Sequence, residues 1–176
     1  MKYYAMQVKT RAEEHFINLI NALYPAAELR IHFPRRIVLE RRQGMEKSER
    51  KTAAIFPGYI FAEINDGDDF IRMIPMFRRM EGFYRFLPSN VHILPLSGND
   101  LEIVLHFIKN SDSVAGVSRV YFNDEDRIVV VEGPLNGLEG NIIKVDKRKG
   151  RAKIKLDLYG AAFAFDLAFV TLERQG

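Results

Sequence analysis

The chain has 176 residues and a formal net charge of +3 at pH 7, with 47% hydrophobic and 28% charged residues. This composition is typical of a globular protein, and no apolar run approaches the roughly 20 residues of a membrane-spanning helix, which excludes a helical membrane protein. The absence of cysteine excludes disulfides and cysteine nucleophiles and, with an N-terminus that lacks the apolar core of a signal peptide, predicts a cytoplasmic location.

The first 109 residues alternate between strand and helix patterns. Thr10 and Glu13 have the spacing of a capping box, which predicts that a helix begins at Thr10. Pro75 is expected to end a shorter helix capped by Asp69, because the residue before a proline is driven out of the helical region. In chain order, the predicted elements are a strand at 3–8, the first helix, strands at 28–32 and 36–42 with a hairpin tip at 41–44, a return strand at 55–64, the short helix, a strand at 82–86 and a helix at 97–109. This order predicts an α+β fold with helices covering a mostly antiparallel sheet.

A change of pattern after residue 109 predicts a second domain. Residues 110–116 are small and polar, a composition typical of a flexible connector, and we place a linker at 110–123. Short strand patterns then follow at 127–131, 140–145, 152–158, 161–167 and 169–172, separated by turn residues. Five short strands in such a length predict a small β-barrel at 124–176, with the first domain at 1–109.

A catalytic function lacks the residues it would need. The histidines at 15, 32, 92 and 106 lie in unrelated segments, without metal-ligand spacing or a neighbouring nucleophile motif. Gly133, Gly137 and Gly140 precede a strand, whereas a phosphate-binding loop needs a helix N-terminus after its glycines. The sequence therefore predicts a protein that is not an enzyme and that uses neither a metal nor a cofactor.

The segment KSERKTAAIFPGY, residues 47–59, leads into an aromatic strand. Along that strand Tyr59, Phe61 and Glu63 share one face, so one side of the strand presents two aromatic rings beside an acid. These rings either lie under a helix as part of the core or form an exposed apolar patch, which normally marks a protein interface.

Basic residues concentrate in one hairpin near the C-terminus. They are Lys144, Lys147, Arg148, Lys149, Arg151, Lys153 and Lys155. Such a cluster can follow a nucleic-acid backbone, because each phosphate contact releases counterions. The alternative is a solvated charged surface that binds nothing.

The two segments KSERK–FPGY and EGPLNGLEGNIIKVD, the second at residues 132–146, resemble the signature segments of NusG-type transcription elongation factors. The likeness extends over nearly the whole chain, although Tyr3 replaces the commoner tryptophan. The resemblance implies an N-terminal α/β sandwich of the NGN type, followed by a small SH3-like β-barrel, the KOW domain. It also implies a monomeric, non-enzymatic factor that binds RNA polymerase.

The resemblance carries over to particular residues. Phe56, Pro57, Tyr59, Phe61, Phe83, Phe86 and Ile93 match the pocket that grips the β′ clamp helices of RNA polymerase. Lys9, Arg11, Arg78 and Arg79 match basic residues that touch the non-template DNA strand. Leu158 and Tyr159 match the segment that docks a small-subunit ribosomal protein or the Rho factor.

The basic hairpin favours one branch of this family. It resembles LoaP, a specialised antitermination paralogue whose KOW domain reads an RNA hairpin, so the seven basic residues above become candidates for binding nascent RNA. Two alternatives stay open at this stage. The chain could be the housekeeping factor, acting in elongation, Rho-dependent termination and coupling to translation, or a ribosome-associated KOW protein that binds RNA.

Overall fold

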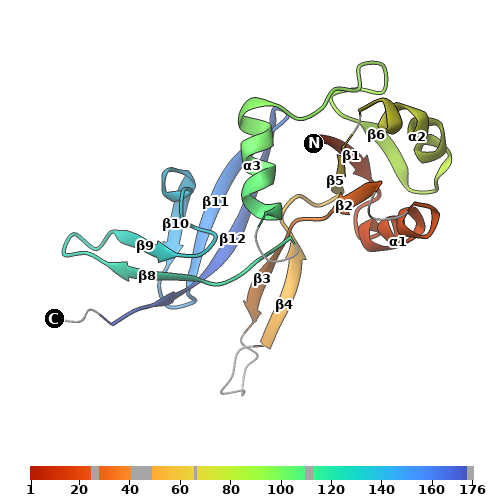
Figure 1. Ribbon diagram of the computed structural model, residues 1–176. Helices are drawn as coiled ribbons and strands as arrows, with labels where there is room; N and C mark the ends of the chain where they lie inside the picture. Colours follow the sequence, from red (N-terminus) through yellow and green to blue (C-terminus); the bar gives the residue numbers. More distant parts are fainter. Residues whose placement is uncertain (25–27, 41–48, 66, 110–112, 174–176) are drawn as a thin grey trace. The chain divides into compact units, whose positions relative to one another are not determined.

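The computed structural model describes residues 1–24, 28–40, 49–65, 67–109 and 113–173, which form two compact units (Figure 1). The first unit consists of Met1–Pro34 and Phe56–Leu105, and the second of Arg35–Ile55 and His106–Gly176. Residues 35–55, which the sequence places in the N-terminal domain, thus join the C-terminal unit.

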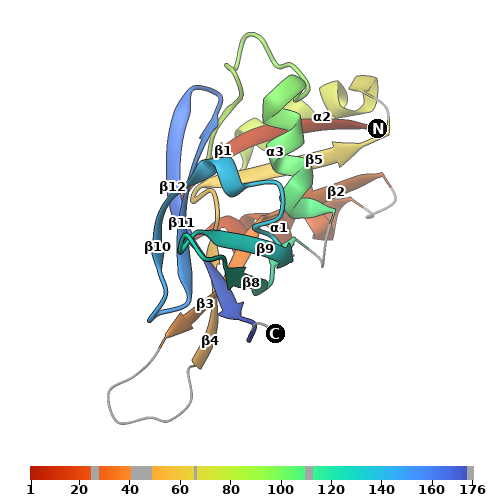
Figure 2. The same ribbon diagram turned by 90° about the vertical axis from the view of Figure 1, so that its left-hand side faces the viewer.

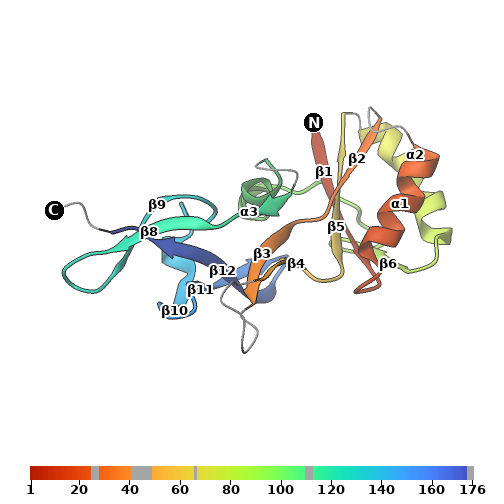
Figure 3. The same ribbon diagram turned by 90° about the horizontal axis from the view of Figure 1, so that it is seen from below.

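The first unit is built on an antiparallel sheet with the strand order β2-β5-β1-β6. Its strands are β1 (Lys2–Val8), β2 (Leu29–His32), β5 (Tyr59–Ile64) and β6 (Phe83–Phe86). The helices α1 (Glu13–Leu23) and α2 (Gly67–Arg79) lie on one side of the sheet, and α3 (Gly98–Ile108) lies on the other (Figures 1 and 3). This arrangement confirms the predicted α+β sandwich.

The core of the first unit lies between the sheet and the helices α1 and α2. Strand alternation supplies it with Met6 and Val8 from β1 and with Ile60, Ala62 and Ile64 from β5, all buried. Aromatic rings fill the helix side: Phe70 of α2 stacks on Tyr4 with ring centroids 4.1 Å apart and meets Phe86 edge-on at 5.7 Å. Such pairs add to the stabilisation that burial of their large apolar area supplies.

Two helix boundaries differ from the predictions. The first helix begins at Glu13 instead of Thr10, because the Glu13 carboxylate is buried and accepts a hydrogen bond from the Gly58 N–H at 2.7 Å instead of capping the helix. The second helix continues through Pro75 to Arg79, since Phe77, two residues further on, packs into the aromatic core. Tertiary contacts overrode both local signals.

The predicted return strand at 55–64 is wrong. Strand β3 (Arg35–Glu40) pairs instead with β4 (Glu49–Ala54), and β5 pairs with β1 and β2 in the other sheet. The turn at 55–58 separates β4 of the second unit from β5 of the first, so the chain passes from one unit to the other at this turn. The predicted hairpin tip at 41–44 lies outside the described residues.

The second unit contains a curled sheet with the strand order β10-β11-β12-β8-β9 (Figure 2). Its strands are β8 (Ser118–Phe122), β9 (Ile128–Glu132), β10 (Ile142–Asp146), β11 (Arg151–Leu158) and β12 (Ala161–Thr171). Neighbours are antiparallel except β8 and β12, which run parallel. A smaller sheet joins β4, β3 and β7 (Val114–Ala115). The curled sheet is consistent with the expected KOW barrel.

The five strands are not the five that the sequence predicts. Strand β8 lies inside the predicted linker, where Ser118 and Val120 are buried and pair with Phe169 and Thr171 of β12. The strands predicted at 161–167 and 169–172 form the single strand β12. The predicted linker at 110–123 is therefore corrected: its described residues include strands β7 and β8.

Candidate functional site

The FPGY segment forms a tight turn that fixes the entry into β5. The Tyr59 N–H donates to the Phe56 carbonyl at 3.0 Å, and Gly58 has φ of +79°, which is the geometry of a type II turn with proline at its second position. The Gly58 carbonyl accepts a hydrogen bond from the Val8 N–H at 2.8 Å. The turn is thus held by β1 and by Glu13 of α1.

Gly58→Ala is expected to destabilise the protein by about 2–3 kcal/mol, because a side chain costs about 1–2 kcal/mol in the left-handed region and a Cβ also crowds its neighbours here. That Cβ would lie 2.9 Å from Thr10 Oγ1 and 3.1 Å from the Val8 carbonyl. Gly98→Ala is the matched control, since Gly98 has φ of +53° and nothing within 4 Å of a Cβ. Chemical denaturation of both variants checks the difference, and equal losses would contradict the close approach.

The face of the sheet that carries Tyr59 and Phe61 is opposite to the face covered by α1 and α2. The strand register aligns three rows across this face, which we call the FPGY face: Arg85, Gln7 and Tyr59; Ala5, Phe61 and His32; and Tyr3, Glu63 and Arg30. In the first row the Arg85 Nε donates to Gln7 Oε1 at 2.8 Å. Both end rows thus combine an arginine with a tyrosine, and the row at Tyr3 adds the carboxylate of Glu63.

The polar end of the FPGY face centres on Glu63. Its carboxylate lies 2.5 Å from His32 Nε2, and both side chains are largely buried. The Tyr3 ring lies beside His32, with centroids 6.5 Å apart, and burial together with the Glu63 charge raises the pKa of the Tyr3 phenol above its ordinary value. Sequence reasoning found Glu63 but missed His32, because β2 meets β5 only through non-local pairing.

The predicted polymerase-binding residues do not form one patch. Phe56 and Phe61 lie together with ring centroids 6.0 Å apart, both fully buried, while Tyr59 is half-buried and Pro57 exposed. The remaining members, Phe83, Phe86 and Ile93, pack with the aromatic core on the α1 and α2 side. Phe83 and Phe86 lie on the opposite face of the sheet from Tyr59, because they align with Val8 and Met6 of β1, which face the core.

The four predicted DNA-contacting side chains are exposed. The Lys9 N–H donates to the Gly82 carbonyl at 2.7 Å, which brings the segment after β1 beside the turn that follows α2. Arg78 donates to the Asn90 carbonyl at 2.5 Å, so its guanidinium is already held by the loop after β6. Lys9, Arg11 and Arg79 carry the rest of the positive charge in this region.

The seven residues of the basic hairpin separate into three environments. Lys144, Lys153 and Lys155 are exposed on the outer face of the β10–β11 ladder, where Lys144 pairs directly with Lys153. The opposite face of β11 carries Ala152, Ile154, Leu156 and Leu158, all buried. This alternation confirms that Lys153 and Lys155 point away from the core.

The turn between β10 and β11 is built by its own side chains. Asp146 Oδ1 accepts a hydrogen bond from the Lys149 N–H at 2.9 Å, which leaves Arg148 and Lys149 exposed at the tip. Lys147 is different: its ammonium pairs with Asp126 and lies 4.1 Å from the centre of the Phe122 ring. Lys147 therefore anchors the turn to the neighbouring hairpin.

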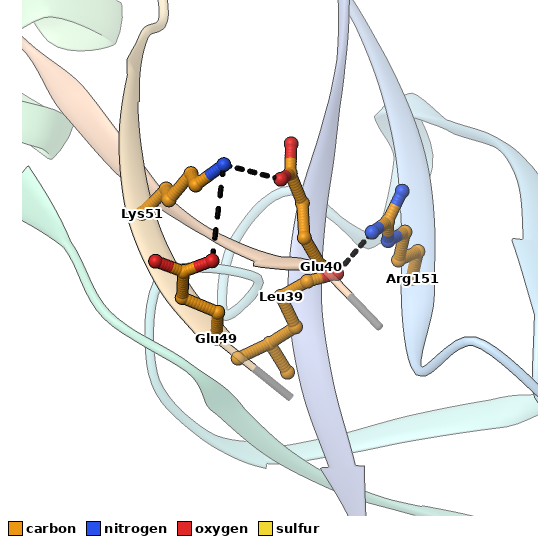
Figure 4. A network of polar contacts seen from close by, with 5 residues as sticks. All are labelled: Leu39, Glu40, Glu49, Lys51 and Arg151. Atoms are coloured by element: carbon orange, nitrogen blue, oxygen red, sulfur yellow. Dashed lines mark hydrogen bonds and ion pairs between the residues drawn. The ribbon is translucent and has the colours of Figure 1, made fainter. Parts of the chain in front are cut away.

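Arg151 contacts the β3–β4 hairpin. Its guanidinium donates to the Leu39 carbonyl (Figure 4). Nearby, the Arg36 guanidinium lies 5.7 Å from the centre of the Phe165 ring and donates to the Ala54 carbonyl. Burial lowers the pKa of Arg36 below its ordinary value, with Asp166 opposing this shift. The sequence did not predict this group, because it joins segments more than 100 residues apart.

Leu158 and Tyr159 occupy the turn between β11 and β12. Leu158 is fully buried, and Tyr159 and Gly160 both have positive φ, as the two central residues of a type I′ hairpin turn require. The prediction that Leu158 contacts a partner is therefore not compatible with this structure, since its side chain belongs to the core. Tyr159 is half-buried.

None of the helices in the described part of the chain is long and apolar enough to cross a bilayer. The described residues also contain no group of three or more acidic, histidine or cysteine side chains placed to hold a metal ion.

Comparisons with known proteins point to one family. The family model described as transcription termination factor nusG matches residues 1–105. The transcription termination/antitermination protein NusG of Haemophilus influenzae is 30% identical over 129 residues, which span 73% of this chain and 66% of that protein. The NusG of Helicobacter pylori is 21% identical over 99% of this chain and 98% of its own length. A solved structure of Thermotoga maritima NusG superposes with a TM-score of 0.50 at 17% identity, over 95% of this chain and 93% of that one, which supports the fold.

Proposed function

Because this chain belongs to the NusG family of transcription termination/antitermination factors, which are not enzymes, we propose that it binds RNA polymerase and promotes processive, antiterminating elongation. The contact surface is the FPGY turn and the Tyr59 end of the FPGY face, where Pro57 is exposed and Tyr59 half-buried, and the buried rings of Phe56 and Phe61 support them. The partner element is the pair of β′ clamp helices. The protein then acts as a monomer in the cytoplasm, where transcription takes place.

The first unit also carries exposed basic residues that could contact the non-template DNA strand. Lys9, Arg11 and Arg79 are exposed at one end of the sheet, and Arg78 is held by the Asn90 carbonyl. Phosphate contacts of this kind position a protein without reading sequence. Arg78 then serves chiefly to hold the loop after β6, and the other three residues supply the contacts.

The second unit supplies the operon-specific part of the proposed function, the binding of a nascent RNA hairpin as in LoaP-like paralogues. One observation carries this proposal: Lys144, Lys153 and Lys155 form an exposed row on the outer face of the β10–β11 ladder, next to Arg148 and Lys149 at its tip. A structured RNA is read mainly through its shape and backbone, which such a row can contact. Recruitment of a ribosomal protein or Rho is less favoured, because Leu158 is buried.

The RNA proposal is tested by titrating the full chain against RNA from the leader upstream of its own coding sequence and against a scrambled RNA of equal length. Preferential binding of the leader supports the operon-specific function. Equal and weak binding of both RNAs would indicate instead that the second unit recruits a protein, as in the housekeeping factor.

Tyr59→Ala is expected to weaken polymerase binding about 30-fold, because loss of an aromatic anchor at an interface costs about 2 kcal/mol. Tyr59 is half-buried beside Gln7, so the truncated protein keeps its core. The matched control is Tyr84→Ala, which removes the same atoms from a side chain that is 56% exposed on the edge strand β6. Pull-down of purified RNA polymerase by the three proteins measures the effect, and equal recovery would remove the FPGY face from the interface.

A further inference from the structure

Two turns of the second unit are joined by one side chain, that of Lys147. The first turn, at 123–127, connects β8 to β9, and the second, at 147–150, connects β10 to β11. The Lys147 ammonium pairs with the Asp126 carboxylate and lies 4.1 Å from the centre of the Phe122 ring, at the end of β8. We call this contact of Lys147 with Asp126 and Phe122 the Lys147 clasp.

The turn that carries Asp126 is held by its own hydrogen bonds. The Asn123 side-chain oxygen accepts from the Glu125 N–H at 3.1 Å and from the Arg127 N–H at 2.9 Å. The Asp126 N–H donates to the Asn123 carbonyl at 2.9 Å. Asp126 has φ of +62°, a left-handed conformation that aspartate and asparagine adopt more readily than most residues. The Asp126 carboxylate is therefore presented from a backbone with little freedom.

The basic turn is held on its other side by β12. The Phe169 N–H donates to the Gly150 carbonyl at 2.8 Å, and the Phe169 ring meets the Phe122 ring edge-on with centroids 6.0 Å apart. Gly150 has φ of +61°, and a Cβ there would lie 2.6 Å from the Phe169 carbonyl oxygen, so the turn passes close to β12. Together with the hydrogen bond from the Lys149 N–H to Asp146, these contacts restrict the backbone of the turn.

The side chains at the tip take their direction from this backbone. Arg148 and Lys149 follow Lys147 directly and are exposed, whereas the charge of Lys147 is directed back to the clasp. The Lys147–Asp126 pair is itself partly exposed, and a pair of that kind contributes little to the stability of a protein. We therefore expect the clasp to restrict the position of the turn and not to determine whether the unit folds.

We propose that Lys147 is a positioning residue: the clasp holds Arg148 and Lys149 in one arrangement and thereby selects a base-paired RNA over a single strand. The inference rests on the proposed RNA binding and names the class of RNA that this site takes. The phosphates of an RNA helix lie at fixed positions, so cations that are already in place lose little conformational freedom on binding. A flexible single strand can adapt to mobile cations and gains less from such an arrangement.

The first test is Asp126→Asn in the full chain, because asparagine tolerates the left-handed conformation but removes the ion pair. The variant is expected to bind the leader RNA about fivefold more weakly, and to bind equally well a leader in which one strand of each stem is replaced so that no stem forms. The opposite result, tighter binding of the leader, is expected if Asp126 only neutralises a phosphate-binding Lys147 or if net charge alone matters.

Glu125→Gln is the matched control. It changes the net charge equally, one residue earlier in the same turn, where the Glu125 carboxylate lies 3.2 Å from Arg127 Nε and outside the clasp. Its binding of both RNAs is expected to stay the same. Unchanged or tighter binding of the leader by Asp126→Asn, an equal loss in Glu125→Gln, or an equal loss for both RNAs overturns the inference.

The second test separates positioning from phosphate contact. Arg148→Gln is expected to lower the magnitude of the slope of log K against log salt by about one, as the loss of a phosphate contact does. Lys147→Gln is expected to weaken binding of the leader with this slope unchanged, because its charge is directed to Asp126 and Phe122. Equal losses of slope in the two variants would make Lys147 a phosphate contact and overturn its positioning role.

The third test needs no RNA. Amide hydrogen exchange, followed by NMR, is expected to be about fivefold faster at the Lys149 N–H in Asp126→Asn than in the unsubstituted protein or in Glu125→Gln, since the turn is less restricted. Equal exchange in all three proteins overturns the clasp. Failure of the unsubstituted protein to prefer leader over scrambled RNA overturns instead the proposed function on which the inference rests.

Discussion

Phe61→Asp is expected to unfold the first unit and not merely to remove a binding contact. Phe61 is fully buried at the centre of the FPGY face, between Ala5 of β1 and His32 of β2, with the Phe56 ring edge-on against it. His32, its neighbour in the strand register, already contacts the Glu63 carboxylate through Nε2, and an uncompensated buried charge costs about 3–5 kcal/mol. This is a large part of the stability of a typical domain, about 5–15 kcal/mol.

Circular dichroism during denaturation measures this loss of stability. A polymerase pull-down alone cannot separate unfolding from the loss of a binding contact. Tyr59→Asp is the matched control: it introduces the same charge on the same strand face two residues earlier, at a half-buried position. It is expected to keep a cooperative unfolding transition while it weakens polymerase binding. A Phe61→Asp protein as stable as the Tyr59→Asp protein would contradict the burial of Phe61.

Much of the architecture could be read from local patterns. The alternation of Lys153 and Lys155 with Ile154 and Leu156 defined both the strand β11 and its solvent face, as the structure confirms. The helix predicted at 97–109 is observed as α3. These elements are predictable because the periodicity of a strand or helix with one buried face is written in consecutive residues.

Strand pairing could not be read in this way. The sequence shows that β3 and β5 are strands but does not show that β4 intervenes and pairs with β3. The same limit explains the polymerase-binding prediction: Phe83 and Phe86 are aromatic like Phe61, but the register of β6 on β1 turns them to the opposite face. A shift of one residue in pairing exchanges the two faces of a strand, so residue type alone cannot assign the side.

Charge was equally ambiguous without the structure. In the sequence the basic residues of the hairpin form one cluster. In the structure Lys147 pairs with Asp126 and lies over the Phe122 ring, and Arg151 donates a hydrogen bond to the Leu39 carbonyl. Both partners come from distant segments that no local pattern relates to the hairpin. The structure thus limits the proposed RNA surface to the row on the outer face and the two residues at the tip.

Lys153→Gln with Lys155→Gln is expected to weaken binding of the leader RNA about 10- to 100-fold at low salt. Each lost phosphate contact also lowers the magnitude of the slope of log K against log salt by about one, so the double variant should lose about two. Both side chains lie on the exposed face of β11, opposite Asp166 and Ala164 of β12, so glutamine leaves the buried face unchanged.

The control for this prediction is Lys2→Gln with Lys109→Gln, two exposed lysines outside the curled sheet that give the same change in net charge. If RNA binding depended only on the overall charge of the protein, both double variants would lose affinity equally, because long-range attraction follows net charge. If the row on β11 follows the RNA backbone, only the first variant loses both affinity and salt slope. A fluorescence titration of leader RNA at several salt concentrations separates the two, and equal slopes in all three proteins would show that Lys153 and Lys155 belong to a solvated surface.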